Sequence, residues 1–188
     1  MDLFEIRNWF AHNLCDYLRE KNKRALRELE EVIEAVLSGS SLIPHLNINI
    51  KEEDPYTKEY VKEKALSYRK FLETLPQEFE PAGEEIGKTV ELAKLLFEKG
   101  LYFEVHEILE EVWMGEFGKD RDFLQALIQI GVAYYHLENF NTRGFELLLQ
   151  NALELLEGYS GTLYGVNVDR LKEELLKALK SREKVSLQ

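Results

Sequence analysis

The chain has 188 residues, of which 45% are hydrophobic, and a formal net charge of −11 at pH 7. This apolar content is typical of a folded protein rather than a disordered one, and the length suits one domain with a sizeable core or one domain plus an extension. Nucleic acids and anionic membrane surfaces bind basic protein surfaces, so the acidic balance argues against both as partners.

Three features predict a soluble, cytoplasmic protein. Cys15 is the only cysteine, so no intrachain disulfide forms and a reducing compartment fits. The first ten residues, MDLFEIRNWF, lack the basic and apolar regions of a signal peptide. No apolar run approaches the length of about 18 residues that a transmembrane helix requires.

Residues 1–80 are predicted to form an N-terminal helical extension. Apolar residues at helical spacing indicate three helices, at residues 3–20, 22–37 and 56–74. Asp2 is the expected N-cap of the first helix. His12 and His45 have no carboxylate at ligand spacing, so surface or capping roles are expected for both. Trp9 and Phe10 belong to an apolar stripe through which this part of the chain is able to self-associate as a homo-oligomer.

Residues 38–55 interrupt the helical period. Leu46, Ile48 and Ile50 alternate with asparagines, which is typical of extended backbone. Because a single strand cannot form a sheet, an ordered loop is expected here.

Residues 81–188 are predicted to form a helical bundle after a linker that begins at Leu75-Pro76. The pattern indicates five helices, at residues 84–99, 102–114, 121–138, 142–158 and 168–183. Asn167 is the expected N-cap of the last helix, and residues 158–167 are expected to form a turn. Residues 121–138 are apolar almost all round, which indicates a buried central helix. The fold class is therefore all-α, a compact helical bundle with an N-terminal helical extension.

The helix at residues 102–114 carries polar residues at the border of its apolar face. On a helical wheel, His106 and Glu110 lie about 40 degrees apart and are bracketed by large apolar residues. They are expected to point inward or into a cleft. Glu104, Glu107 and Glu111 lie further round and are expected to face water or the rim.

The central helix repeats this feature with Gln125, Gln129 and His136, which lie within about 40 degrees of one line. Polar groups on a buried helix need hydrogen-bond partners, because each unsatisfied group costs about 1–3 kcal/mol. If the two helices pack antiparallel, this polar line faces His106 and Glu110.

Such a cluster fits a metal-dependent hydrolytic site. His106, Glu110 and His136 are the candidate ligands for zinc or a similar divalent ion, with one coordination position left for water. Without metal, His106 held by Glu110 is able to act as a general base. Gln125 and Gln129 would position water or substrate. The alternative is a non-catalytic binding or scaffold module in which these residues form a polar network that fixes helix register.

Two arginines lie near the cluster in sequence. Arg143 is a candidate for binding an anionic substrate group, and a plain surface arginine is the simpler alternative. Arg121 begins the central helix, where a cation is electrostatically unfavourable. It is expected to pair with Glu110 or Glu111, or to be solvated.

Three motifs in the same order resemble a known family, domain of unknown function 309. They are FEVHEILEEVW at residues 103–113, QALIQ at residues 125–129 followed by His136, and NTRG at residues 141–144. The resemblance covers roughly residues 95–160. The chain departs from the family pattern at three positions: Ala126 replaces a glycine, Gly131 an alanine and Phe140 the glycine before the asparagine.

The resemblance implies a compact helical bundle with a buried central helix. The family is sometimes labelled a predicted metal-dependent hydrolase, which implies His106, Glu107, Glu110 and His136 as candidate ligands or acid–base groups. The substrate or partner, whether a small molecule or a protein, is not specified. Residues 1–80 lie outside the matched motifs.

Overall fold

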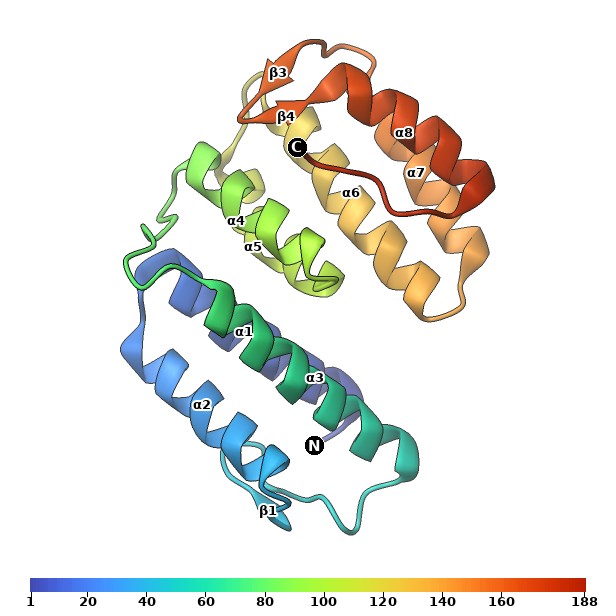
Figure 1. Ribbon diagram of the computed structural model, residues 1–188. Coiled ribbons are helices and arrows are strands. Elements are labelled where there is room, and N and C mark those ends of the chain that lie inside the picture. The colour runs from blue at the N-terminus through green and yellow to red at the C-terminus, as the bar shows by residue number, and fades with distance from the viewer. The chain divides into compact units, whose positions relative to one another are not determined.

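The computed structural model describes all 188 residues, which divide into two compact units, Met1–Pro81 and Ala82–Gln188. The chain consists of α-helices with two very small β-hairpins, so the predicted all-α class is confirmed (Figure 1). None of the helices combines the length and the apolar character that crossing a membrane requires.

The first unit contains three helices, α1 (Leu3–Glu20), α2 (Lys23–Leu37) and α3 (Pro55–Thr74). As predicted, Asp2 caps α1: its side chain accepts a hydrogen bond from the Glu5 backbone N–H, and the Glu5 side chain accepts one from the Asp2 N–H. The apolar faces of the three helices supply the core of the unit, which includes Ile6, Phe10, Leu14, Leu18, Leu29, Tyr68 and Phe71.

The segment between α2 and α3 differs from the expected loop. It forms an antiparallel hairpin of β1 (Leu42–Ile43) and β2 (Ile48–Asn49). The alternation at Leu46, Ile48 and Ile50 predicted an extended piece or one short strand without a partner. The strand is paired instead, because His45 and Asn47 adopt left-handed backbone conformations, with φ of 63° and 52°, and reverse the chain. Leu46, between them, is fully buried and attaches the turn to the core.

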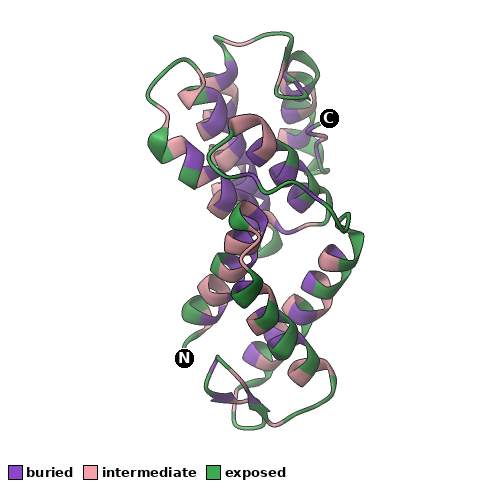
Figure 2. Cartoon of the chain, turned by 90° about the vertical axis from the view of Figure 1, so that its left-hand side faces the viewer, coloured by how far each residue is buried: buried purple, intermediate pink, exposed green.

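The second unit contains α4 (Ile86–Glu98), α5 (Tyr102–Gly115), α6 (Arg121–Glu138), α7 (Thr142–Leu156), the hairpin of β3 (Thr162–Leu163) and β4 (Val166–Asn167), and α8 (Val168–Ser181). Helix α6 packs against both α5 and α7, and its buried residues cover about half of its circumference. The predicted buried central helix is thus confirmed. Figure 2 shows buried and exposed positions alternating along the helices.

Gly131 sets the distance between α5 and α6. A Cβ atom at this position would lie 2.9 Å from Val105 Cγ1 and 3.3 Å from the Tyr102 carbonyl oxygen. The two helices therefore approach more closely than a side chain at residue 131 permits. Gly131, which stands where the family pattern has alanine, therefore allows the close packing of α5 and α6.

The C-terminal residues are fixed to the core by Tyr134. Its hydroxyl donates a hydrogen bond to the Glu183 carbonyl at 2.5 Å and accepts one from the Val185 N–H at 3.2 Å. Burial raises the pKa of Tyr134 well above its ordinary value. Val185 and Leu187 are buried, so the last residues complete the second unit.

Candidate metal centre on helix α5

Three side chains of α5 form a compact group. The ligand atoms of His106, Glu107 and Glu110 all lie within 4.8 Å of one another. His106 Nδ1 is 3.3 Å from Glu107 Oε1, and His106 Nε2 is 3.5 Å from Glu110 Oε2. Residues four apart on a helix share one face, which brings Glu110 to His106. Glu107 reaches the other ring nitrogen from the adjacent position, so the local spacing of one helix assembles the whole group.

The group lies at the edge of the core. The side chains of His106, Glu107 and Glu110 are 23%, 17% and 42% exposed. Phe103 lies beside the imidazole, with its ring centroid at 5.6 Å. His106 Nδ1 is buried and makes no hydrogen bond, because the nearby Glu107 oxygen does not have hydrogen-bond geometry. The imidazole is therefore held near two carboxylates without being satisfied by either.

The glutamates of α5 do not divide as the wheel predicted. Glu104, expected at the surface, is fully buried, and Glu107 is less exposed than Glu110. Only Glu111 is exposed as expected. A helical wheel compares each residue only with its neighbours on the same helix. Burial also depends on which residues of other elements pack against that position. Glu104 is thus the residue that pattern analysis missed, and its position in the aromatic–Glu–x–His motif was the only signal.

His136 lies outside this group, in the last turn of α6, where it contacts the connection to α7. Its Nδ1 is 3.3 Å from Asn141 Nδ2, and its carbonyl accepts a hydrogen bond from the Asn141 N–H at 2.9 Å. Asn141 also caps α7 by accepting from the Gly144 N–H at 2.9 Å. Phe140, where the family pattern has glycine, keeps a positive φ of 60°. The Asn–x–x–Gly motif therefore builds a helix–turn–helix connection that includes His136.

The candidate substrate-binding residues also lie apart from the three ligand atoms. Gln125 and Gln129 line a groove of about 710 Å³ between α6 and α7, together with Asn151 and Glu154. Arg143 is exposed in the first turn of α7. The polar line of α6 thus borders a groove with α7. No hydrogen bond or ion pair joins this line to His106 or Glu110, so the predicted contact between the two polar sets is not found.

Arg121 anchors the end of α5. Its Nη1 donates hydrogen bonds to the carbonyls of Trp113 at 2.9 Å and Glu116 at 2.7 Å. The guanidinium carbon lies 4.1 Å from the centroid of the Trp113 ring. The expected pairing with Glu110 or Glu111 is therefore wrong, because the C-terminal carbonyls of a helix are themselves an electrostatic partner for a cation.

Burial and hydrogen bonding raise the pKa values of two tyrosines of the second unit. Burial, assisted by the charge of Glu138, raises the pKa of Tyr102 to about 12. The Asp120 carboxylate accepts a hydrogen bond from the Tyr164 hydroxyl at 2.6 Å and raises the pKa of Tyr164 to about 12. Both phenols stay protonated at neutral pH and therefore supply no base.

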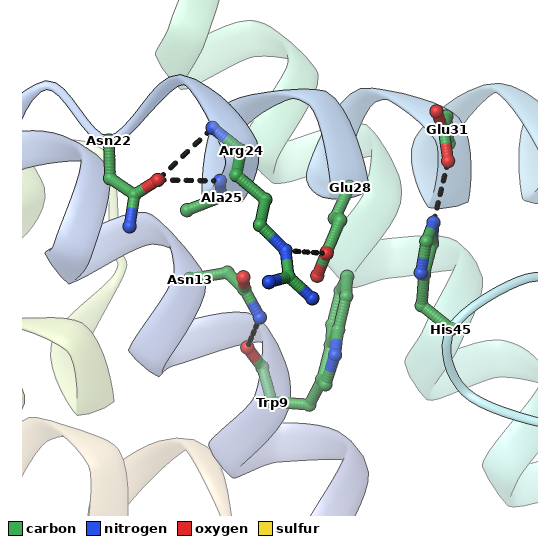
Figure 3. Close-up of polar contacts among 8 residues, drawn as sticks. All are labelled: Trp9, Asn13, Asn22, Arg24, Ala25, Glu28, Glu31 and His45. Atoms are coloured by element: carbon green, nitrogen blue, oxygen red, sulfur yellow. Dashed lines mark hydrogen bonds and ion pairs between the residues drawn. The ribbon is translucent and has the colours of Figure 1, made fainter.

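The first unit contains a histidine–carboxylate pair that the sequence did not indicate. His45 Nε2 lies 2.6 Å from Glu31 Oε2, and the His45 ring stacks on Trp9 with centroids 6.3 Å apart (Figure 3). The sequence has no carboxylate at ligand spacing from His45, and the contact with Glu31 forms only because the hairpin turn carries His45 back to α2. No third metal-binding side chain joins the pair.

Residues 90–148 match the family described as "Domain of unknown function (DUF309)". The predicted family resemblance is confirmed. The DUF309 segment includes the α5 group, both glutamines of α6 and the turn with His136.

A curated relative, "Uncharacterized protein YpuF" of Bacillus subtilis (strain 168), is 35% identical over 88 residues. The alignment covers 45% of this chain and 51% of the relative, so the chain spans about half the length of the curated relative that it matches. No solved structure matches the chain. Neither the DUF309 description nor the relative's name states an activity.

Proposed function

We propose that His106, Glu107 and Glu110 bind a divalent metal ion and that the protein is a metal-dependent hydrolase. The observation that carries this proposal is the group itself: three ligand atoms within 4.8 Å of one another, one of them on an imidazole whose buried Nδ1 makes no hydrogen bond. A purely architectural polar network would be expected to satisfy that nitrogen, because a buried unsatisfied polar atom costs about 1–3 kcal/mol.

The donor set fits a divalent ion. One imidazole nitrogen and two carboxylate oxygens are ligands of zinc and of related ions, at distances of about 2.0–2.2 Å. The two carboxylates offset the charge of a divalent cation. Since all three ligand atoms lie within 4.8 Å of one another, rotamer adjustments within one helix are enough to bring them to a common centre. Three protein ligands leave a coordination position for water.

The exposure of the group suits hydrolysis. A divalent ion there would supply Lewis-acid activation of a bound water molecule. Glu110 is the most exposed member of the group, at 42%, so in this proposal one of its oxygens binds the ion and the other meets water and accepts its proton. Glu107 and His106 are more enclosed and hold the centre in place. In the absence of an ion, Glu110 orients His106 as a general base.

The first test is metal content. Full-length protein is purified without chelators and analysed for zinc and manganese, and the apo protein is titrated with each ion. About one equivalent of metal is expected, together with weaker uptake by about 10–100-fold when His106→Ala or Glu110→Gln removes one ligand. The loaded protein is then assayed with chromogenic phosphoesters and carboxylic esters, on which the same variants should lose activity.

The chain offers two matched controls. His45 has a carboxylate at 2.6 Å but no third ligand, so His45→Ala should leave metal uptake unchanged. His136→Ala tests whether His136 is a ligand. If His136→Ala reduces metal uptake as much as His106→Ala does, the third ligand is His136 and not Glu107. A folded protein that takes up no metal, and in which His106→Ala changes only the melting temperature, would support the non-catalytic module instead.

A further inference from the structure

The groove between α6 and α7 is a separate feature of the second unit. Its volume is about 710 Å³, and its lining comes from four places: the connection before α6, the first half of α6, the end of α7 and the connection that follows α7. The size is within the range of pockets that hold small molecules. None of the three α5 ligands lines it.

The charge of the groove is unbalanced. Asp122 on α6 and Glu154 and Glu157 at the end of α7 contribute three negative charges, and Lys119 contributes one positive charge. None of the three carboxylates forms an ion pair within the chain. Because carboxylates on two different helices converge on one concave surface, the groove attracts a cation more strongly than a flat acidic surface would.

Amides between these charges provide hydrogen-bond acceptors. Gln125 and Gln129, one turn apart on α6, face Asn151 of α7 across the groove. The Gln129 Oε1 atom is buried and makes no hydrogen bond within the chain. An amide oxygen in this position lacks an N–H or O–H donor, which a bound ligand can supply.

An aromatic residue with a fixed position, Tyr159, is among the residues that line the groove. The Tyr159 hydroxyl donates a hydrogen bond to the Lys119 carbonyl, and the Tyr159 carbonyl accepts one from Lys172 Nζ. The ring centroid lies 6.1 Å from that of Phe123. A tyrosine held at both its hydroxyl and its backbone presents a stable π-face, which attracts ammonium groups.

We propose that this groove binds a small aliphatic amine through its primary ammonium group. The carboxylates of Asp122, Glu154 and Glu157 supply the electrostatic attraction, and the amide oxygens of the groove accept the N–H hydrogen bonds. An ammonium group has three donors and no acceptor, so it matches a surface with several acceptors and a net negative charge. The site is independent of the proposed metal centre, because it uses none of its residues.

The test is calorimetric titration of the full chain with 1,4-diaminobutane at physiological ionic strength. Saturable one-to-one binding is expected, and 1,4-butanediol, which has the same length and no charge, should not bind. Titration with magnesium ions is a second comparison. A general attraction of cations to an acidic surface would bind the divalent metal as strongly as the diamine. No diamine binding at millimolar concentration, or equal binding of the diol, overturns the proposal.

Two charge-matched variants locate the site. Glu154→Gln should weaken diamine binding by about five- to tenfold, the loss of one charge-assisted contact. Glu173→Gln removes the same charge from an exposed position on α8, outside the groove, and should have no effect. If both variants weaken binding equally, the diamine binds as a counterion and the proposal is wrong. Chemical shift changes in the side-chain amides of Gln125, Gln129 and Asn151 on titration should confirm the location, and their absence contradicts it.

Discussion

Both units place a histidine beside a carboxylate, but they do so by different means. In the second unit, His106 meets Glu107 and Glu110 on the same helix, so the contacts follow from spacing. In the first unit, His45 meets Glu31 across 14 residues, and the contact exists only because a hairpin turn returns the chain to α2. The comparison teaches that a helical period is enough to predict a local cluster, while a pair of this second kind depends on turn geometry and burial.

The largest effect is expected from removing the support of the His45 turn. Leu46 is fully buried, and Leu46→Ala should lower the free energy of unfolding by about 2–5 kcal/mol because of the lost burial and the cavity that remains. The His45 imidazole resonances should change, while those of His106 should not. Leu42→Ala, on the same hairpin but 70% exposed, is the control and should change stability little. A His106 response as large as that of His45 would remove the distinction between the two sites.

The second effect tests whether the α5 group is independent of its neighbour. Gly131→Ala places a methyl group 2.9 Å from Val105 Cγ1 and should destabilise the protein by about 1–3 kcal/mol through overpacking. Metal uptake by the α5 group should persist, since its three ligands share one helix. Gly115→Ala, with open space around the new Cβ, serves as the control in a denaturant titration. Loss of metal uptake in Gly131→Ala would show that the packing of α6 is needed to form the site.

The third effect concerns the end of α5. Arg121→Met removes the donor to the Trp113 and Glu116 carbonyls and should cost about 1–2 kcal/mol of stability. Arg143→Met removes an exposed arginine and should stay within about 0.5 kcal/mol of the parent. Thermal unfolding of the two variants side by side measures the difference. Equal values would mean that the contacts of Arg121 contribute nothing net.

The smallest effect is expected at the α6–α7 turn. Phe140 has a φ of 60° and is 93% exposed, so Phe140→Gly relieves left-handed strain without loss of core packing. A gain of about 0.5–1 kcal/mol in the free energy of unfolding is expected. Phe140→Ala, which keeps a Cβ, should not give this gain. An unchanged or lower stability of Phe140→Gly would show that the phenyl ring itself contributes to the turn.

The helices and the local cluster on α5 were predictable from the order of residues alone. Apolar spacing placed all eight helices to within a few residues, and polar residues at Asp2 and Asn167 indicated caps that the structure contains. The same spacing identified His106 and Glu110 as neighbours. These features depend on contacts between residues one turn apart or less, which the order of residues specifies directly.

Contacts between polar residues of different elements depend on the tertiary packing and were not predictable from the helical pattern. The sequence pattern grouped His136, Gln125 and Gln129 with the α5 residues. In the structure, His136 lies at the end of α6 beside Asn141. The two glutamines line a groove with α7. The structure also buries Glu104 and joins His45 to Glu31. The physical reason is that a helical wheel gives the direction of a side chain from its own axis, while its partner depends on how neighbouring helices are rotated and on how closely they approach. At Gly131 that approach is set by the absence of a single Cβ atom.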